Sequence, residues 1–267
     1  MPLQSQSPVM HNRFAALASP PRVPRYFENW VGKWVDEWAA KNNKLPDIGY
    51  ALNLGDLECL DNDEWRGWLK DPIIHSVMQL MAFRAKELGL RHYYFDPFQV
   101  ELLLAGKNDV CPANLVLENV DLIFFPTNVG LHWFLTIVDV RQRELTLYES
   151  LHEERADYIK KMGDLIAIWA KRQKYTPLVP TSGAATALTV CAPKTKLAIQ
   201  KDSSSCGLHT LANADCVGSG RNPNCFGNEP KEYENDMIKF RKRLQKLLMK
   251  FVVSDSIPWS PGRLRIV

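Results

Sequence analysis

The chain lacks several features that would assign it to a common class of protein. Its six cysteines, among 267 residues, include no C-x-x-C pair and no cysteine–histidine spacing suited to zinc, so neither a zinc site nor a disulfide scaffold is expected. It has no run of about 18 apolar residues, and its start lacks the charged and apolar regions of a secretory signal. We therefore expect free thiols, no membrane association and an intracellular location, in the nucleus or cytoplasm.

The net charge is also small. The formal net charge is +3, and no basic stripe is interleaved with aromatic residues, so nucleic acid is not an expected partner. Apolar residues make up 46% and charged residues 24%, which is typical of a globular domain with a sizeable core. No sequence feature indicates a cofactor or a metal, and a monomer is expected.

Composition and hydrophobic spacing divide the chain into four parts. Residues 1–25, rich in Pro, Ser and Gln, predict a flexible tail, and residues 256–267 a second one. Residues 26–53 form a predicted helical extension, and residues 54–255 the main domain. In the extension, tryptophans recur every four residues, which indicates a helix whose aromatic face packs on the main domain rather than docking a partner: Trp30, Trp34 and Trp38.

The main domain reads as α+β, with helices around a central, largely hairpin-linked sheet. Residues 120–126 and 133–139 are apolar strand candidates, 141–143 a charged turn, and 145–149 a returning strand. Amphipathic helices are predicted for residues 155–172 and 237–251. A further helix is expected to start at Asp71-Pro72, with Asp71 as its cap and with an apolar face: Ile73, Ile74, Val77, Met78 and Met81.

Four residues supply the parts of a cysteine hydrolase. Cys206, at the predicted start of an apolar helix, offers a nucleophile that the helix dipole would favour as the thiolate. His132 opens one strand and Glu149 closes the next, so the hairpin would let the carboxylate orient the imidazole. Gln200, six residues before Cys206, and the Cys206 backbone N–H would face an oxyanion. Gly207 would let the backbone approach a substrate closely.

Other groups offer less chemistry. His209, three residues beyond Cys206, is expected to pack or face solvent. A serine nucleophile is not indicated, because no G-x-S-x-G elbow occurs.

The ordered motifs resemble the ubiquitin-like-protein proteases, the SUMO-deconjugating (sentrin-specific) cysteine peptidases. The resemblance runs from about Leu54 to Met249. It rests on residues 68–74, on residues 129–139 around His132, on residues 147–151 around Glu149, and on residues 200–207. The final helix, near residues 237–242, is also similar.

The resemblance implies a papain-like or adenain-like cysteine protease fold and cleavage after the C-terminal Gly-Gly of SUMO or a related modifier. It also implies that Trp68 and Trp133 flank a narrow tunnel for that diglycine. Two positions depart from the family pattern: Glu149 stands where Asp is usual, and Ser205 precedes the nucleophile where Asp is usual. Neither departure removes a catalytic group.

Two other function classes remain open from sequence. Effector acetyltransferases use the same His, Glu and Cys set, although no basic pocket for acetyl-CoA is evident. A non-catalytic modifier-binding module would not need the complete set of catalytic residues. Within the peptidase reading, the modifier can be SUMO, ubiquitin or another relative, and the site of action is a host cell if the protein is a delivered effector.

Overall fold

The computed structural model describes residues 30–49, 51–60, 67–107, 111–180, 187–223, 226–227 and 230–252, so both predicted tails lie outside it. The described α-helices are α1 (Val31–Asn42), α2 (Leu54–Leu57), α3 (Asp71–Glu87), α4 (Pro97–Leu104), α5 (Ala156–Arg172), α6 (Cys206–Gly218) and α7 (Pro230–Leu248). The strands are β1 (His92–Tyr94), β2 (Leu122–Val129), β3 (His132–Asp139), β4 (Glu144–Tyr148) and β5 (Thr189–Cys191). Short 3-10 turns lie at Glu58–Leu60, Leu117–Asn119, Thr176–Leu178 and Met249–Phe251.

The strands form one sheet in the order β1-β2-β3-β4-β5. The central pairs β2–β3 and β3–β4 are antiparallel, while the three-residue edge strands β1 and β5 are parallel to their neighbours. The predicted α+β class and mostly antiparallel central sheet are therefore confirmed.

A two-residue turn fixes where β3 begins. Val129 pairs with His132, and the intervening Gly130 and Leu131 have φ of 62° and 69°. Positive φ at both central residues is the type I′ geometry, whose twist matches that of a hairpin. This turn makes His132 the first residue of β3, on the side of the sheet where β4 ends.

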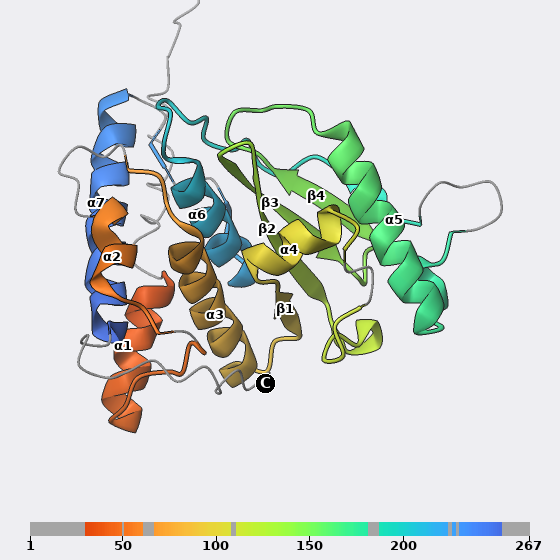
Figure 1. Cartoon of the computed structure of the whole chain (residues 1–267), viewed down its shortest axis with the longest axis horizontal. Helices are drawn as coiled ribbons and strands as arrows, with labels where there is room; N and C mark the ends of the chain where they lie inside the picture. Colours follow the sequence, from red (N-terminus) through yellow and green to blue (C-terminus); the bar gives the residue numbers. More distant parts are fainter. Residues whose placement is uncertain are drawn as a thin grey trace, which may run out of the picture.

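Helices cover both faces of the sheet (Figure 1). Helices α1, α3, α6 and α7 share one apolar cluster on one face, and α5 lies against the other. Alternation along β3 divides its side chains between these layers, because successive strand residues point to opposite faces. Trp133 and Leu135 join the first cluster, whereas Phe134 and Val138 join the second.

The tryptophan helix packs on the main domain, as predicted. Trp30, which precedes the first residue of α1, meets Phe240 of α7 edge-on at 5.7 Å between ring centroids. Trp34 and Trp38 both contact Phe83 of α3, at 6.0 and 5.1 Å. The aromatic face is thus used to join α1 to the two helices beside it.

The start of α3 differs slightly from the prediction. Lys70, not Asp71, occupies the N-cap position, and Asp71 and Pro72 are the first two helical residues. Both are suited to that place, since a first-turn carboxylate complements the helix dipole and proline lacks only an N–H that would have no partner there. The predicted apolar face of α3 is buried.

Candidate active site

The structure brings His132 and Glu149 into direct contact. Nε2 of His132 lies 2.6 Å from Oε1 of Glu149. Leu135 pairs with Tyr148, so continuing that register by one residue would set Glu149 opposite Phe134, diagonally from His132. Diagonal neighbours on one face of a sheet are about 7–8 Å apart, a span that favours a longer side chain. This geometry gives a reason for Glu at a position where Asp is the family's usual residue.

Glu149 is held as an anion by several donors. Oε1 also accepts the N–H of Leu151 at 3.0 Å, and Oε2 accepts the N–H of Glu153 at 3.0 Å. Arg155 places its Nη2 3.7 Å from Oε2. Burial raises the pKa of this carboxyl, but the hydrogen bonds from His132 and from the two backbone amides outweigh burial and lower it. Glu149 is therefore charged at neutral pH.

His132 lies between this carboxylate and the Cys206 sulfur. Burial lowers the pKa of the imidazole, but hydrogen bonds with Cys206 and Glu149 outweigh burial and raise the pKa to about 9. Since Nε2 is bound to Glu149, the nitrogen left for Cys206 is Nδ1. The ring is consequently an imidazolium at neutral pH, held between two groups that favour its positive charge.

Cys206 is the first residue of α6 and is buried. The N-cap residue, Ser205, makes no side-chain capping bond. Instead, Oδ1 of Asp202 accepts the backbone N–H groups of Ser204 and Ser205, both at 2.7 Å. The sulfur lies at the positive end of the α6 dipole, where a thiolate is favoured.

Gln200 is fixed at both ends of its amide. Ser150 Oγ donates to Oε1 at 2.9 Å, and Nε2 donates to the backbone carbonyl of Asp202 at 2.7 Å. The backbone N–H of Gln200 also donates to the Ser150 carbonyl at 2.9 Å. Nε2 also lies 3.5 Å from Asp202 Oδ1. These bonds join the nucleophile loop to the end of β4, and the oxyanion role of Gln200 stays a prediction.

The two predicted tunnel tryptophans differ in exposure. Trp133 is 2% exposed and donates from Nε1 to the Leu69 carbonyl at 3.0 Å, whereas Trp68 is 43% exposed. Leu69 also packs on Gly207, where an added Cβ would lie 2.9 Å from the Leu69 Cβ. Close packing on Leu69 therefore explains glycine at position 207, and the predicted substrate contact of Gly207 stays a prediction, as does the tunnel.

Three polar residues at the site received no role from the sequence. Arg155 faces Glu149, Ser150 orients Gln200, and Asp202 binds the loop before α6. Ser150 and Asp202 each lie within two residues of a predicted catalytic residue, and an Asp shortly before a helix is a recognised capping signal. Arg155 had no comparable signal, since its position depends on how the loop after β4 folds back.

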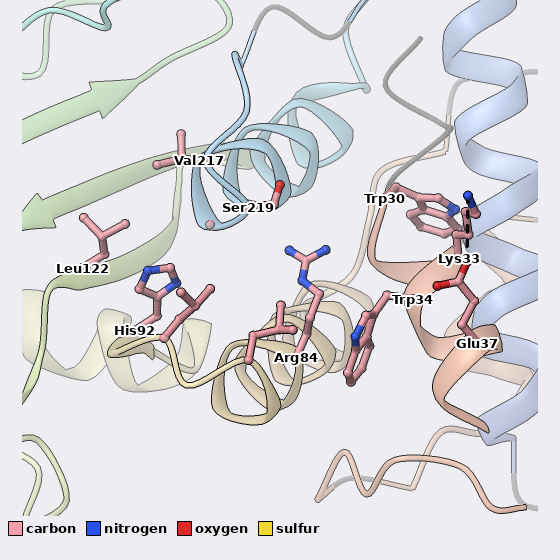
Figure 2. A pocket seen from close by; sticks show the side chains of 13 residues that line it. Trp30, Lys33, Trp34, Glu37, Arg84, His92, Leu122, Val217 and Ser219 are labelled. Atoms are coloured by element: carbon pink, nitrogen blue, oxygen red, sulfur yellow. Dashed lines mark ion pairs between the residues drawn. The ribbon is translucent and has the colours of Figure 1, made fainter. Parts of the chain in front are cut away.

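A cavity of about 590 Å³ lies elsewhere, at the opposite end of α6 from Cys206 (Figure 2). Trp34, His92 and Val217 are among the residues that line it. The Arg84 guanidinium lies within it, 5% exposed, and pairs at 2.7 Å with Asp215, which is fully buried. None of the predicted site residues lines this cavity. Among the described residues, no cluster of His, Cys, Asp or Glu could hold a metal ion.

The Arg84–Asp215 pair provides a stability test. Asp215→Asn would leave the buried guanidinium without its counter-charge, which we expect to cost about 3–5 kcal/mol of unfolding free energy. Asp121→Asn is the control, because Asp121 pairs with the more exposed Arg91 and should cost far less. Urea denaturation measures both, and equal losses would contradict a structural role for the buried pair.

Comparisons with known proteins agree on one family. The model of the Ulp1 protease family, C-terminal catalytic domain, matches residues 67–253. Sentrin-specific protease 5 of Homo sapiens is 24% identical over 229 residues, which make up 85% of this chain and 28% of that protein. The chain thus spans little more than a quarter of the length of the curated relatives it matches. In the described residues, no helix is long and apolar enough to cross a membrane.

Solved structures share the fold. A de-sumoylating protease superposes with a TM-score of 0.58 at 17% identity, over 76% of this chain and 91% of that one. The Ulp1 protease domain in complex with Smt3, the yeast ortholog of SUMO, superposes with a TM-score of 0.51 at 17% identity, over 87% of this chain and 99% of that one. The protease fold predicted from the sequence is confirmed.

Proposed function

The chain belongs to the Ulp1 protease family, and on that premise we propose that it is a cysteine protease that cleaves after the C-terminal Gly-Gly of SUMO or a related ubiquitin-like modifier. The observation that supports this most directly is the Glu149–His132 contact of 2.6 Å, and the interaction of Cys206 with the same imidazole helps to raise its pKa. This contact supports an array of nucleophile, base and orienting acid.

In the proposed reaction, the Cys206 thiolate attacks the carbonyl carbon of the last glycine. The tetrahedral oxyanion is bound by the Cys206 backbone N–H and the Gln200 amide. His132 gives its proton to the leaving amine, so the C–N bond breaks and a thioester remains. His132, now neutral, takes a proton from water, whose oxygen attacks the thioester and releases the glycine carboxylate and the thiol. Glu149 stabilises the imidazolium at each stage.

The substrate class rests on similarity and on the tryptophans. Similar proteins are named as SUMO proteases, and one of them is bound to the yeast ortholog of SUMO. Trp68 is exposed beside Leu69, whose carbonyl is bound by Trp133. We propose that Trp68 closes over the diglycine and that Trp133 forms the floor beneath it, with Gly207 next to the floor. The match of the chain to a family of proteases favours cleavage of the modifier over acetyl transfer or non-catalytic modifier binding.

Cleavage of modifier fusions ending in Gly-Gly, Ala-Gly and Gly-Ala tests the proposal. A methyl group between the indoles would overpack the tunnel and cost about 1–3 kcal/mol, or roughly ten- to a hundredfold in binding. The loss in rate should be larger, since a displaced carbonyl misses the oxyanion donors in the transition state. SUMO and ubiquitin fusions assayed side by side identify the modifier. Equal rates for all three endings would contradict the tunnel, and no cleavage of any ending would favour the acetyltransferase alternative.

The remaining features of the proposal follow from the reaction. The partner is SUMO or a related modifier together with its conjugates, and neither nucleic acid nor a membrane is needed. We expect a monomer that acts in the nucleus or cytoplasm, where the conjugates are formed.

A further inference from the structure

A buried chain of hydrogen bonds runs beneath the nucleophile loop. Nε2 of His209, on α6, lies 2.9 Å from the hydroxyl of Tyr233 on α7. That hydroxyl donates to Oδ2 of Asp202 at 3.2 Å. His209 and Tyr233 are 3% and 1% exposed, so this polar pair lies in the core. His209 thus packs in the core, as expected, with its ring edge-on to Phe226 at 4.9 Å between ring centroids, and it also bonds to a polar partner.

The number of protons on each group fixes the direction of these hydrogen bonds. Burial lowers the pKa of His209 to about 4, so the ring is neutral at physiological pH. A tyrosine hydroxyl has a single proton, and here that proton goes to the Asp202 carboxylate. The hydroxyl oxygen must then accept from His209, which is therefore protonated on Nε2. Each group donates one hydrogen bond to the next, and the last acceptor is the Asp202 carboxylate.

Asp202 connects these hydrogen bonds to the segment that bears the proposed oxyanion donors. Its Oδ1 accepts the N–H groups of Ser204 and Ser205, and its backbone carbonyl accepts Nε2 of Gln200. The segment it binds therefore joins the two proposed oxyanion donors, the Gln200 amide and the Cys206 N–H. A rotation of the Asp202 carboxylate would break its bonds to the Ser204 and Ser205 amides and so release the loop that joins the two donors.

We propose that Tyr233, supported by His209, is a positioning residue that holds Asp202 and thereby sets the conformation of the loop bearing the oxyanion donors. This inference deepens the proposed function and rests on it, because the loop matters for rate only if an oxyanion forms there. Tyr233 touches neither the substrate nor the reacting atoms. Its effect should appear in the transition state and not in substrate binding.

Tyr233→Phe tests the inference, because it removes one hydroxyl and keeps the ring. With a SUMO–aminocoumarin conjugate, kcat should fall roughly 10- to 100-fold with KM changed less than about twofold, since a small misplacement near the reacting atoms has effects of this size. The control is Tyr158→Phe on α5, which also loses a buried hydroxyl, one that lies 2.9 Å from Thr127 Oγ1. It should lower stability by a similar amount and leave kcat unchanged.

Hydrogen exchange measures the loop without any substrate. The amides of Ser204 and Ser205, bound to Asp202, should exchange slowly in the wild type and faster in Tyr233→Phe, while Tyr158→Phe leaves them unchanged. If the wild type cleaves no modifier, the proposed function fails, and this measurement still decides whether Tyr233 holds the loop. Unchanged exchange, or a kcat equal to that of Tyr158→Phe, would overturn the inference.

A conservative substitution provides a rescue. In Asp202→Asn the amide nitrogen can donate to Tyr233, whose hydroxyl then donates to His209 in its other tautomer, so the whole chain can reverse. The amide oxygen still accepts from Ser204 and Ser205. Asp202→Asn should therefore keep most of the kcat that Asp202→Ala loses. Equal losses in the two variants would contradict a hydrogen-bonded positioning role.

Discussion

Replacing Cys206 by alanine is expected to abolish cleavage of a SUMO fusion while leaving the fold and the binding of the modifier intact. The change removes one buried sulfur atom, and the hydrogen bonds of the preceding loop end on Asp202, not on the thiol. Losing the nucleophile of such an array costs on the order of 10⁶-fold in kcat, because the other members have no covalent partner to assist.

A second cysteine on the same helix is the matched control. Cys216, ten residues after Cys206, is also buried and forms no disulfide. Cys216→Ala therefore makes the same substitution on the same helix, away from the proposed nucleophile. The Cys216→Ala variant should cleave the SUMO fusion at nearly the wild-type rate. Calorimetry with SUMO should give similar affinities for Cys206→Ala and the wild type. Comparable turnover by Cys206→Ala would mean that another group is the nucleophile.

The acid–base pair of the site was predictable because its parts are close in sequence. His132 and Glu149 are 17 positions apart and belong to one hairpin, whose alternation and charged turn are visible in the sequence. The start of α6 at Cys206 was similarly marked by a polar run followed by an apolar one. Local patterns of this kind depend on backbone geometry, which the sequence specifies directly.

Long-range polar contacts were not predictable in the same way. Tyr233 reaches Asp202 across 31 positions, and Arg84 reaches Asp215 from another helix. Both depend on how α3, α6 and α7 pack, and no spacing rule connects residues on separate helices. Trp133 shows the same limit, since the family resemblance implied a tunnel wall but not that its Nε1 is bound to the Leu69 carbonyl. Such contacts follow from tertiary packing.

Glu149→Gln is expected to lower kcat by about 10⁴-fold, the size of effect seen when a triad acid loses its charge. Both oxygens of Glu149 accept N–H groups: Oε1 from His132 and Leu151, and Oε2 from Glu153. An amide nitrogen at either place would face a donor, so glutamine cannot satisfy all of these bonds at once. Glu153→Gln is the control, because its exposed side chain pairs with Arg155 at 2.7 Å while its backbone N–H is unchanged.

The pH profile distinguishes loss of charge from loss of shape. In the wild type His132 has a pKa of about 9, so the thiolate–imidazolium pair should be lost, and kcat/KM should fall, as pH rises through about 9. The Glu149 carboxylate helps to raise that pKa, so a neutral amide lowers it. The alkaline limb of Glu149→Gln should therefore lie at lower pH than that of the wild type or Glu153→Gln. An unmoved limb would show that Glu149 does not stabilise the imidazolium, and the proposed triad would reduce to Cys206 and His132.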